Sequence, residues 1–277
     1  HKNDTYYWKA NSTDWKEGNT TETWIYIIGN ETASNTAPTL PTLIYPSFDS
    51  VIYNRTVVFN WTNSTDADED TIYYDLFITR QSCTATRCSK SYIEVVGLTE
   101  NNYTSEPLDV DAVYNWTVSA RDASLNSGNA SMNNFTLASL ACLDVNNRIE
   151  FGTMMPEESK NTSSDNPAPF VVENCGNIPL NLSAYANASL FYTQPLDQPY
   201  FQYKADNVSM EITAFNHSST MYNWTNVSAE LRHMITALNW SAESDEGQIE
   251  LYINVPQNET SGDRETTIIV ETASVVE

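Results

Sequence analysis

The stretch Val113-Tyr-Asn-Trp-Thr-Val-Ser-Ala-Arg-Asp-Ala123 decides the fold class of this chain. Its apolar side chains occupy every second position: Tyr114, Trp116, Val118 and Ala120. Its polar side chains occupy the positions between them: Asn115, Thr117, Ser119 and Arg121. This period of two predicts a β-strand with one face buried and the other in solvent.

A second copy of this strand lies in Thr5-Tyr-Tyr-Trp-Lys-Ala-Asn-Ser-Thr-Asp14. Aligning Trp8 with Trp116 requires no gap over that stretch. The first thirty residues thus repeat the last third of the domain that follows them. The repeat indicates a modular chain whose first module is incomplete.

Composition limits the classes of partner. The 277 residues include 36 acidic and 13 basic ones, a formal net charge of −23. Nucleic acids and anionic membranes bind basic surfaces, so neither is an expected partner. With 40% hydrophobic residues the chain can form folded cores. The sequence begins at His1 and has no apolar run of about 18 residues, so neither a signal peptide nor a membrane span is visible in it.

Asparagine occurs in an unusual context in this chain. Twenty of its thirty asparagines stand in Asn-x-Ser/Thr with x other than proline, whereas chance would give about six, since serine and threonine make up 58 of the 277 residues. N-glycans need outward-facing acceptors, and strand phase supplies them where Asn60 lies between Phe59 and Trp61. The pattern predicts a secreted, densely N-glycosylated protein. The predicted acceptors are Asn3, Asn11, Asn19, Asn30, Asn54, Asn60, Asn63, Asn102, Asn115, Asn129, Asn134, Asn161, Asn181, Asn187, Asn207, Asn216, Asn223, Asn226, Asn239 and Asn258.

Four cysteines agree with secretion, because disulfides form in oxidising compartments. Cys83 and Cys88 are predicted to close a hairpin tip. Cys142 and Cys175 are predicted to tie a leading strand to a neighbour. On the loop-entropy model these closures contribute about 2 and about 4 kcal/mol. A zinc site is the alternative, but the chain has no Cys-x-x-Cys and its three histidines are scattered.

Strand-like segments and turn signals divide the chain into modules. We expect a partial module at 1–30, a linker at 31–37, a β-sandwich at 38–140 and a second β-sandwich at 141–277. Strands of the first sandwich are predicted near 42–45, 51–61, 71–79, 91–98, 113–121 and 132–138, a spacing typical of this architecture. The predicted fold class is all-β.

Residues 38–140 resemble a fibronectin type III module. The resemblance rests on an early proline-rich strand, on Trp61 in the second strand and on Tyr114-x-Trp116-x-Val118-x-Ala120 in the penultimate one. Residues 1–30 show the same features in truncated form. The Cys83–Cys88 insertion departs from the usual pattern.

The second domain also has a β pattern. Its strands are predicted around 148–152, 169–182, 200–203, 208–212, 248–256 and 266–272. The segment Ser228–Leu238 has helical spacing, with a bulged strand as the alternative. The combination of Phe151-Gly152, Glu173-Asn-Cys-Gly-Asn-Ile-Pro-Leu180 and Asn254-Val-Pro256 resembles immunoglobulin-like modules of archaeal secreted and cell-surface proteins. These resemblances imply tandem immunoglobulin- and fibronectin III-like β-sandwiches.

Catalytic motifs do not occur in the sequence. There is no glycine-rich phosphate loop, no Gly-x-Ser-x-Gly and no His-Glu-x-x-His, so we do not expect an enzyme. The acidic stretch Asp66-Ala-Asp-Glu-Asp70 is the best candidate for a metal site, because carboxylates at alternate loop positions suit Ca²⁺. In a fibronectin-like topology Asp122 lies at the same end. The candidate calcium ligands are therefore Asp66, Asp68, Asp70 and Asp122, with a hydrated acidic turn as the alternative; no other cofactor is expected.

These features together predict a structural glycoprotein of an extracellular filament, surface layer or stalk. Its first thirty residues, read as two strands near 5–12 and 22–28, form a hairpin that is marginal alone and must pack against something. The candidates are an upstream part of a longer polypeptide, the following domain or a neighbouring subunit, reached by strand complementation. The expected partners are copies of the chain or other surface glycoproteins, without membrane insertion. The alternatives are an adhesin or ligand-binding ectodomain for glycans or host proteins, and an accessory domain of a secreted enzyme.

Overall fold

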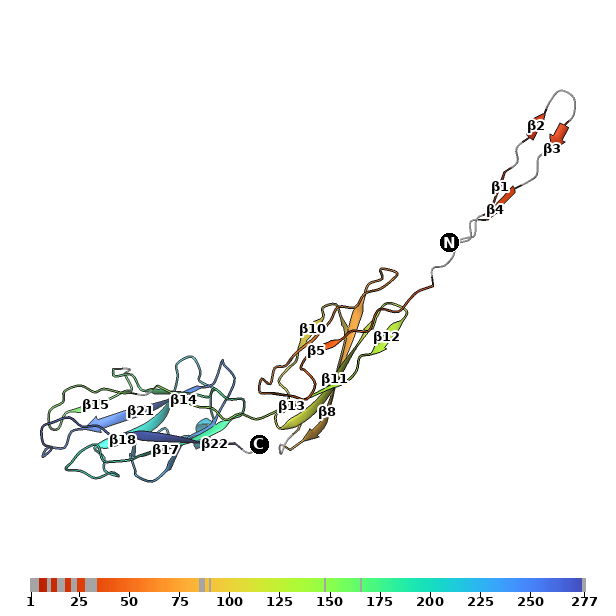
Figure 1. The fold of residues 1–277 in the computed structure, drawn as a ribbon. Coiled ribbons are helices and arrows are strands. Elements are labelled where there is room, and N and C mark those ends of the chain that lie inside the picture. The colour runs from red at the N-terminus through yellow and green to blue at the C-terminus, as the bar shows by residue number, and fades with distance from the viewer. Residues whose placement is uncertain are drawn as a thin grey trace.

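The structure is a computed structural model. It describes residues 5–8, 11–13, 18–20, 24–27, 34–84, 88–89, 91–146, 148–164 and 166–275, and for the four segments before residue 34 it describes the backbone alone. A β-ribbon is followed by two β-sandwiches (Figure 1). The described part is therefore all-β, as predicted, apart from the 3₁₀ turn η1 (His217–Ser219).

The first sandwich has sheet orders β10-β7-β5 and β6-β13-β11-β8-β9. The smaller sheet contains β5 (Leu43–Tyr45), β7 (Val58–Trp61) and β10 (Asn102–Thr104). The larger contains β6 (Ser50–Ile52), β8 (Tyr73–Cys83), β9 (Tyr92–Leu98), β11 (Ala112–Arg121) and β13 (Asn133–Leu137), with β12 (Asn126–Asn129) paired to the end of β11. The alternating stretch 113–121 thus lies in β11, the central strand of the larger sheet.

Aromatic side chains fill the space between these two sheets. Trp61 and Phe59 reach it from β7 and Trp116 from β11, and each is at most 1% exposed. The rings of Phe59 and Trp116 meet edge to face with centroids 5.2 Å apart, a favourable geometry for aromatic pairs. The buried indole N–H of Trp116 donates to the Pro46 carbonyl at 3.1 Å, so the first proline-containing segment is fixed to the core.

Tyr114 forms a tyrosine corner, a feature of immunoglobulin-like sandwiches. Its buried hydroxyl accepts from the Asp109 N–H at 3.0 Å and donates to the Asp109 carbonyl at 3.1 Å. Burial, and secondarily the Asp109 charge, raises the pKa of Tyr114 to about 12. The hydroxyl therefore stays protonated and anchors the chain at the entry to β11.

The predicted strand at 51–61 is wrong in one respect, because the structure has two strands there. Asn54 Oδ1 accepts hydrogen bonds from the N–H of Thr56 at 3.0 Å and its hydroxyl at 2.8 Å, which closes a turn between them. β6 then pairs in parallel with β13, while β7 joins the opposite sheet. A single run of apolar alternation cannot distinguish one long strand from two short ones in different sheets.

The second sandwich has sheet orders β14-β16-β21-β18-β19 and β20-β17-β22. The first sheet contains β14 (Asp144–Val145), β16 (Phe170–Glu173), β18 (Phe201–Asn207), β19 (Thr225–Asn226) and β21 (Glu246–Asn254), with β15 (Ser159–Asn161) paired to β21. The other contains β17 (Leu180–Ala186), β20 (Arg232–Leu238) and β22 (Ile268–Ser274). Its core is a separate apolar cluster around Leu182, Tyr203 and Ile249.

Three predicted strands of this domain are wrong. The segment 169–182 contains two strands, β16 and β17, which belong to different sheets. Residues 148–152 form no strand; Ile149 and Phe151 pack against the core without joining a ladder. Residues 208–212 form turns, in which the Glu211 N–H donates to the Val208 carbonyl at 2.9 Å. Segment 228–238 resolves as the bulged strand β20 rather than a helix, with adjacent Met234 and Ile235 both fully buried.

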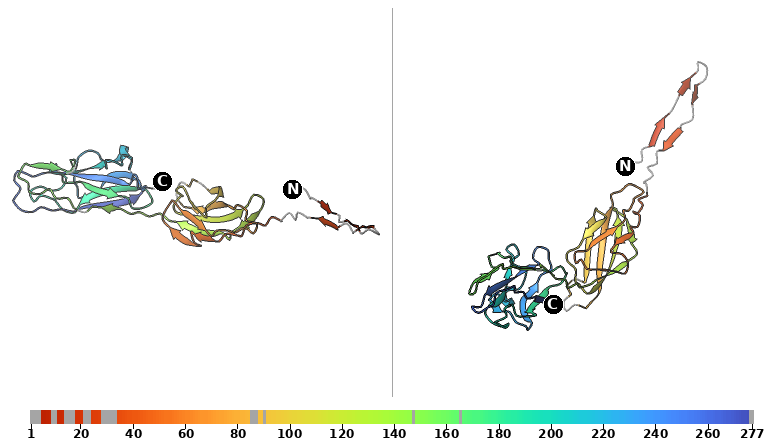
Figure 2. Two further views of the ribbon diagram at one scale, coloured as in Figure 1. Left: turned by 90° about the horizontal axis from the view of Figure 1, so that it is seen from above. Right: turned by 60° about the vertical axis from the view of Figure 1, so that its left-hand side comes forward.

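The N-terminal ribbon is one long hairpin. Its strands are β1 (Thr5–Trp8), β2 (Asn11–Thr13), β3 (Gly18–Thr20) and β4 (Trp24–Ile27). Tyr7 pairs with Ile25, and Ser12 with Asn19, so the two ladders continue each other with a shift of one residue. Among the strands that the structure describes, these four pair only with one another, and Figure 2 shows them apart from both sandwiches.

Replacing Tyr114 by Phe is expected to destabilise the first sandwich by about 1–3 kcal/mol, because the Asp109 N–H and carbonyl lose their partner. Urea unfolding of the full chain measures this as a lower midpoint for one of two transitions. Tyr53→Phe is the matched control, since Tyr53 is 48% exposed. Equal midpoints for the two variants would contradict an anchoring role for the hydroxyl.

Candidate functional site

The acidic loops of the first sandwich hold the segment that leads to the ribbon. Asp122 Oδ2 accepts from the Asn35 side-chain amide at 3.0 Å, and Asp68 Oδ2 accepts from the Thr36 N–H at 2.7 Å. Since Asn35 and Thr36 are consecutive, the loops carrying Asp68 and Asp122 lie at the same end of the sandwich. The backbone N–H groups of Leu125 and Ser124 lower the pKa of Asp122, so it stays ionised.

These carboxylates do not converge into one metal-binding cluster. Throughout the described ranges, no group of three or more histidine, cysteine, aspartate or glutamate residues could hold a metal ion. Asp66 Oδ1 accepts from the N–H of Asp68 at 2.8 Å and of Asp70 at 3.4 Å. Asp66 Oδ2 is inaccessible to solvent and has no hydrogen-bond partner among the residues described. The calcium site stays a prediction.

The junction between the sandwiches is a second site, which no motif of the sequence predicts. Asn177 is 5% exposed, and its side-chain amide donates to the carbonyls of Tyr53 at 2.6 Å and Ala138 at 2.8 Å. Its Oδ1 accepts from the Leu140 N–H at 2.7 Å, and its own N–H donates to the Leu140 carbonyl at 3.0 Å. One side chain of the second domain thus holds both the end of the first domain and the connection.

Three further contacts brace the junction. The disulfide Cys142–Cys175 joins the connection to the loop before Asn177, with Cα atoms 4.9 Å apart. Gly176 lies so close to the Leu140 carbonyl that an added Cβ would be 2.2 Å from its oxygen, so only glycine fits. The Arg55 guanidinium of the first domain lies 4.6 Å from the centre of a Trp240 ring in the second, within range of a cation–π contact.

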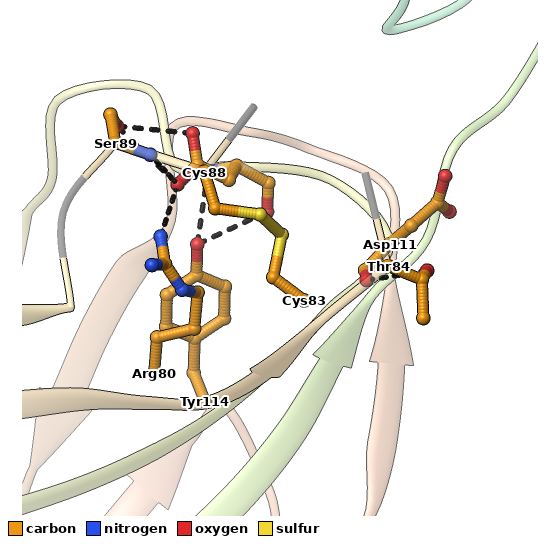
Figure 3. Close-up of a disulfide and its surroundings, with 8 residues drawn as sticks. Arg80, Cys83, Thr84, Cys88, Ser89, Asp111 and Tyr114 are labelled. Carbon is orange, nitrogen blue, oxygen red and sulfur yellow. Dashed lines mark hydrogen bonds and ion pairs between the residues drawn. A yellow bond between two sulfur atoms is a disulfide. The ribbon is translucent and has the colours of Figure 1, made fainter. Parts of the chain in front are cut away.

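The disulfide Cys83–Cys88 is also formed, with Cα atoms 6.5 Å apart. Figure 3 shows it beside Arg80, Ser89 and Tyr114. Arg80 pairs with Asp109 at 2.7 Å, and the Ser89 N–H donates to the same carboxylate at 2.8 Å. The tip of the β8–β9 hairpin is thereby tied to the residue that anchors Tyr114.

A row of carboxylates crosses one sheet of the second sandwich. Asp144 pairs with Glu173, and Glu173 with Glu246, so like charges face one another on three adjacent strands. Burial, and then the charges of Glu211 and Glu173, raises the pKa of both Asp245 and Glu246. A carboxyl whose pKa is raised by folding stabilises the fold as pH falls through that pKa, so these two groups favour the folded state on acidification.

The predicted glycan acceptors can be placed where side chains are described. None of the sixteen in residues 34–275 is buried, whereas Asn174 and Asn177, which lack the motif, are. Asn3 and Asn30 lie outside the described residues, and for Asn11 and Asn19 only the backbone is described. Outward placement is compatible with glycosylation, which stays a prediction.

The exposed ring of Tyr192 has a cation on one of its faces. Tyr192 is 79% exposed, but the Arg264 guanidinium lies 4.0 Å from its ring centre. Arg264 is itself held by Glu259 at 2.7 Å. Burial raises the pKa of Glu259, but hydrogen bonds from Thr193 and Arg264 outweigh it and lower the pKa to about 2. One face of the tyrosine is thus occupied by a stable ion pair.

Comparisons with known proteins do not assign the chain to a family. No family model and no curated protein matches it. Similar solved structures include the FN1–FN3 domains of chicken CNTN1, with a TM-score of 0.29, 9% identity, and coverage of 96% of this chain and 74% of the other. Another is the chitinase ChiA74 from Bacillus thuringiensis (TM-score 0.27, 17% identity, 87% of this chain and 30% of the other). An α-L-rhamnosidase from Aspergillus terreus follows (TM-score 0.26, 8% identity, 84% and 29%).

The sandwich fold is shown by the strand order, the tyrosine corner and the two cores. Within the described ranges no helix is long and apolar enough to cross a membrane. The two disulfides are consistent with a secreted or extracellular protein.

Removing divalent cations tests the calcium site. EDTA is expected to lower the melting temperature of the first sandwich, because an ion bound only by the folded state stabilises it. In Asp70→Asn, which keeps the backbone contacts of the loop, the shift should shrink. Identical melting curves in EDTA and in excess CaCl₂ would remove the site.

Replacing Asn177 by Ala is expected to loosen the junction, because the carbonyls of Tyr53 and Ala138 lose their donor and the Leu140 N–H its acceptor. Small-angle scattering should show a wider spread of maximum dimensions, and urea unfolding a loss of about 2–3 kcal/mol. Gln257→Ala is the control, since Gln257 is an exposed side-chain amide and is not a predicted glycan acceptor. Superimposable scattering profiles would refute the role given to Asn177.

Proposed function

We propose that this protein is a structural, N-glycosylated subunit of an extracellular filament or surface layer. The observation that carries the proposal is the hairpin β1–β4. In the described part of the chain it pairs with neither sandwich, and each sandwich already has its own closed core. A two-stranded ribbon is marginally stable alone, and the aromatic sequence of β1 and β4 favours burial.

Strand addition to a second copy would satisfy this ribbon. Among the described strands, β9, β20 and β22 have seven residues and pair with a strand on one side only. The other side of β20 accepts from the N–H groups of Asn216 and Met221, so β9 and β22 are the two that offer a free edge. The edge of β9 is the better acceptor. The sequence between Asn63 and Asn102, which contains it, has no predicted glycan acceptor, and its Tyr92 and Val96 are 52% and 59% exposed.

Charge argues for the same kind of contact. Copies carrying −23 each repel one another, so an assembly held by surface ion pairs is disfavoured. Main-chain hydrogen bonds and apolar burial do not depend on opposite charge. The repulsion also predicts that salt, which screens exposed charges, promotes assembly.

Paired proline substitutions test the proposal. Tyr7 and Ile25 face each other in the ladder, and Tyr7→Pro with Ile25→Pro would break it. Negative-stain microscopy is expected to show polymers of the full chain and single particles of the proline variant. The melting temperatures of the sandwiches should not change, because the strands that carry these positions pair with no described strand of either sandwich.

The matched control is Tyr7→Val with Ile25→Val, which keeps two residues suited to strands and should still polymerise. Polymers formed by the proline variant would exclude the ribbon as the contact. A full chain that stays single at high concentration and binds a glycan array would instead favour the adhesin.

A further inference from the structure

Two groups among the predicted glycan acceptors differ in their surroundings. Four lie inside strands that are paired on both sides: Asn60 in β7, Asn115 in β11, Asn134 in β13 and Asn181 in β17. Asn54 and Asn216, in contrast, lie in exposed turns. The groups therefore differ in how an enzyme could reach them.

In the strand group the middle residue of the acceptor triplet is a core residue. Trp61, Trp116, Phe135 and Leu182 follow the four asparagines, and each is at most 1% exposed. An enzyme that modifies a peptide binds several consecutive residues in a cleft, so such a triplet must leave the sheet first. For β11 that means removing Trp116 from the core, which amounts to unfolding the domain.

Hydrogen bonds separate the groups in the same way. In the turns the asparagine and the hydroxyl two residues later contact each other: Asn54 Oδ1 accepts from the Thr56 hydroxyl at 2.8 Å, and Asn216 Oδ1 from the Ser218 hydroxyl at 2.8 Å. In β11 the Thr117 hydroxyl is buried and donates to the Ala130 carbonyl at 2.8 Å.

In the other strand triplets, too, a polar atom is bonded elsewhere: in that of Asn60 the Thr62 hydroxyl accepts from the Thr42 N–H at 2.8 Å, while Asn60 Oδ1 has no partner among the described residues. Asn134 Oδ1 accepts from the Asp49 N–H at 2.9 Å, and Asn181 Oδ1 from the Ala237 N–H at 3.0 Å. The polar groups of the strand triplets thus bond to distant parts of the chain. In the turn triplets the asparagine bonds to the hydroxyl of its own triplet.

Strand pairing adds a steric reason. Asn115 stands directly opposite Asn134, and Asn60 directly opposite Asn102. Directly opposite residues have Cβ atoms about 4.5–5.5 Å apart, less than the width of a sugar chain with its hydration. Once the sheet has formed, a glycan on one member covers the other.

We infer that the strand acceptors Asn60, Asn115, Asn134 and Asn181 receive their glycans before the sandwiches fold, whereas Asn54 and Asn216 remain acceptors in the folded protein. The inference rests on the glycosylation included in the proposed function. It assigns the chain two kinds of modification site, distinguished by when they are available.

The test uses the full chain made and folded without glycans, a purified oligosaccharyltransferase and its lipid-linked sugar. Site-resolved mass spectrometry follows transfer over time. Two synthetic peptides, residues 111–121 and 212–222, serve as acceptors free of the fold. Both peptides are expected to be modified, and in the folded chain Asn216 and Asn54 as well. Transfer to Asn115 in the folded chain should be at least about a hundredfold slower than in its peptide, since unfolded fractions are about 10⁻³–10⁻⁶.

Transfer to Asn115 and Asn134 at the rate of Asn216 in the folded chain would overturn the inference. So would failure of the 111–121 peptide, because the local sequence would then explain a silent site. Tyr114→Phe provides a second measurement: a less stable first sandwich should accelerate transfer to Asn115 and leave Asn216 unchanged. A chain that does not polymerise would contradict the proposed assembly but would leave these rates as they are.

Discussion

The edge-to-face packing of Phe59 on Trp116 is the contact on which the first sandwich depends. It joins the two sheets at their centre, and it sets the phase of β7 and β11 on either side. Since successive residues of a strand point in opposite directions, an inward Trp116 requires an outward Asn115. The same rings that exclude water from the core thus decide which polar side chains lie on the surface.

The sequence predicted the parts of the fold that follow from alternation. The strand 113–121, the inward Trp61 and Trp116 and the cysteine pairings are present in the structure. A strand of two to four residues is too short to show an alternation of apolar and polar side chains. The sequence therefore does not predict β10, β14 and β15. At 208–212 the apolar residues Met210 and Ile212 are exposed on a turn, so their alternation wrongly predicts a strand.

The junction could not be predicted for a different reason. Asn177 acts through main-chain carbonyls and an N–H of three residues from two other segments, and such partners leave no trace in side-chain identity. Gly176 and Asn177 belong to the stretch that carries the immunoglobulin-like resemblance, and the resemblance does not predict a contact between domains. Asp68 and Asp122 lie at one end of the first sandwich, as predicted, and there they accept hydrogen bonds from Asn35 and Thr36.

Both sandwiches therefore combine a closed interior with a surface that restricts contact. Repulsion among acidic groups keeps copies apart, and sugar chains at the predicted acceptors would cover the outer faces of the sheets. What remains open to a partner is the edge of a strand. This is the form of contact that a ribbon such as β1–β4 can make.

The bonds at the junction also determine how the chain responds to a pulling force. A pull along the chain loads the bonds of Asn177 together, because they hold the same short connection from Ala138 to Leu140. If they rupture, the Cys142–Cys175 bridge still keeps the 33-residue interval between its cysteines from extending. Fully stretched, that interval would add roughly 110 Å of slack. A filament built from such subunits would therefore bend at the junctions between sandwiches before its chains extend.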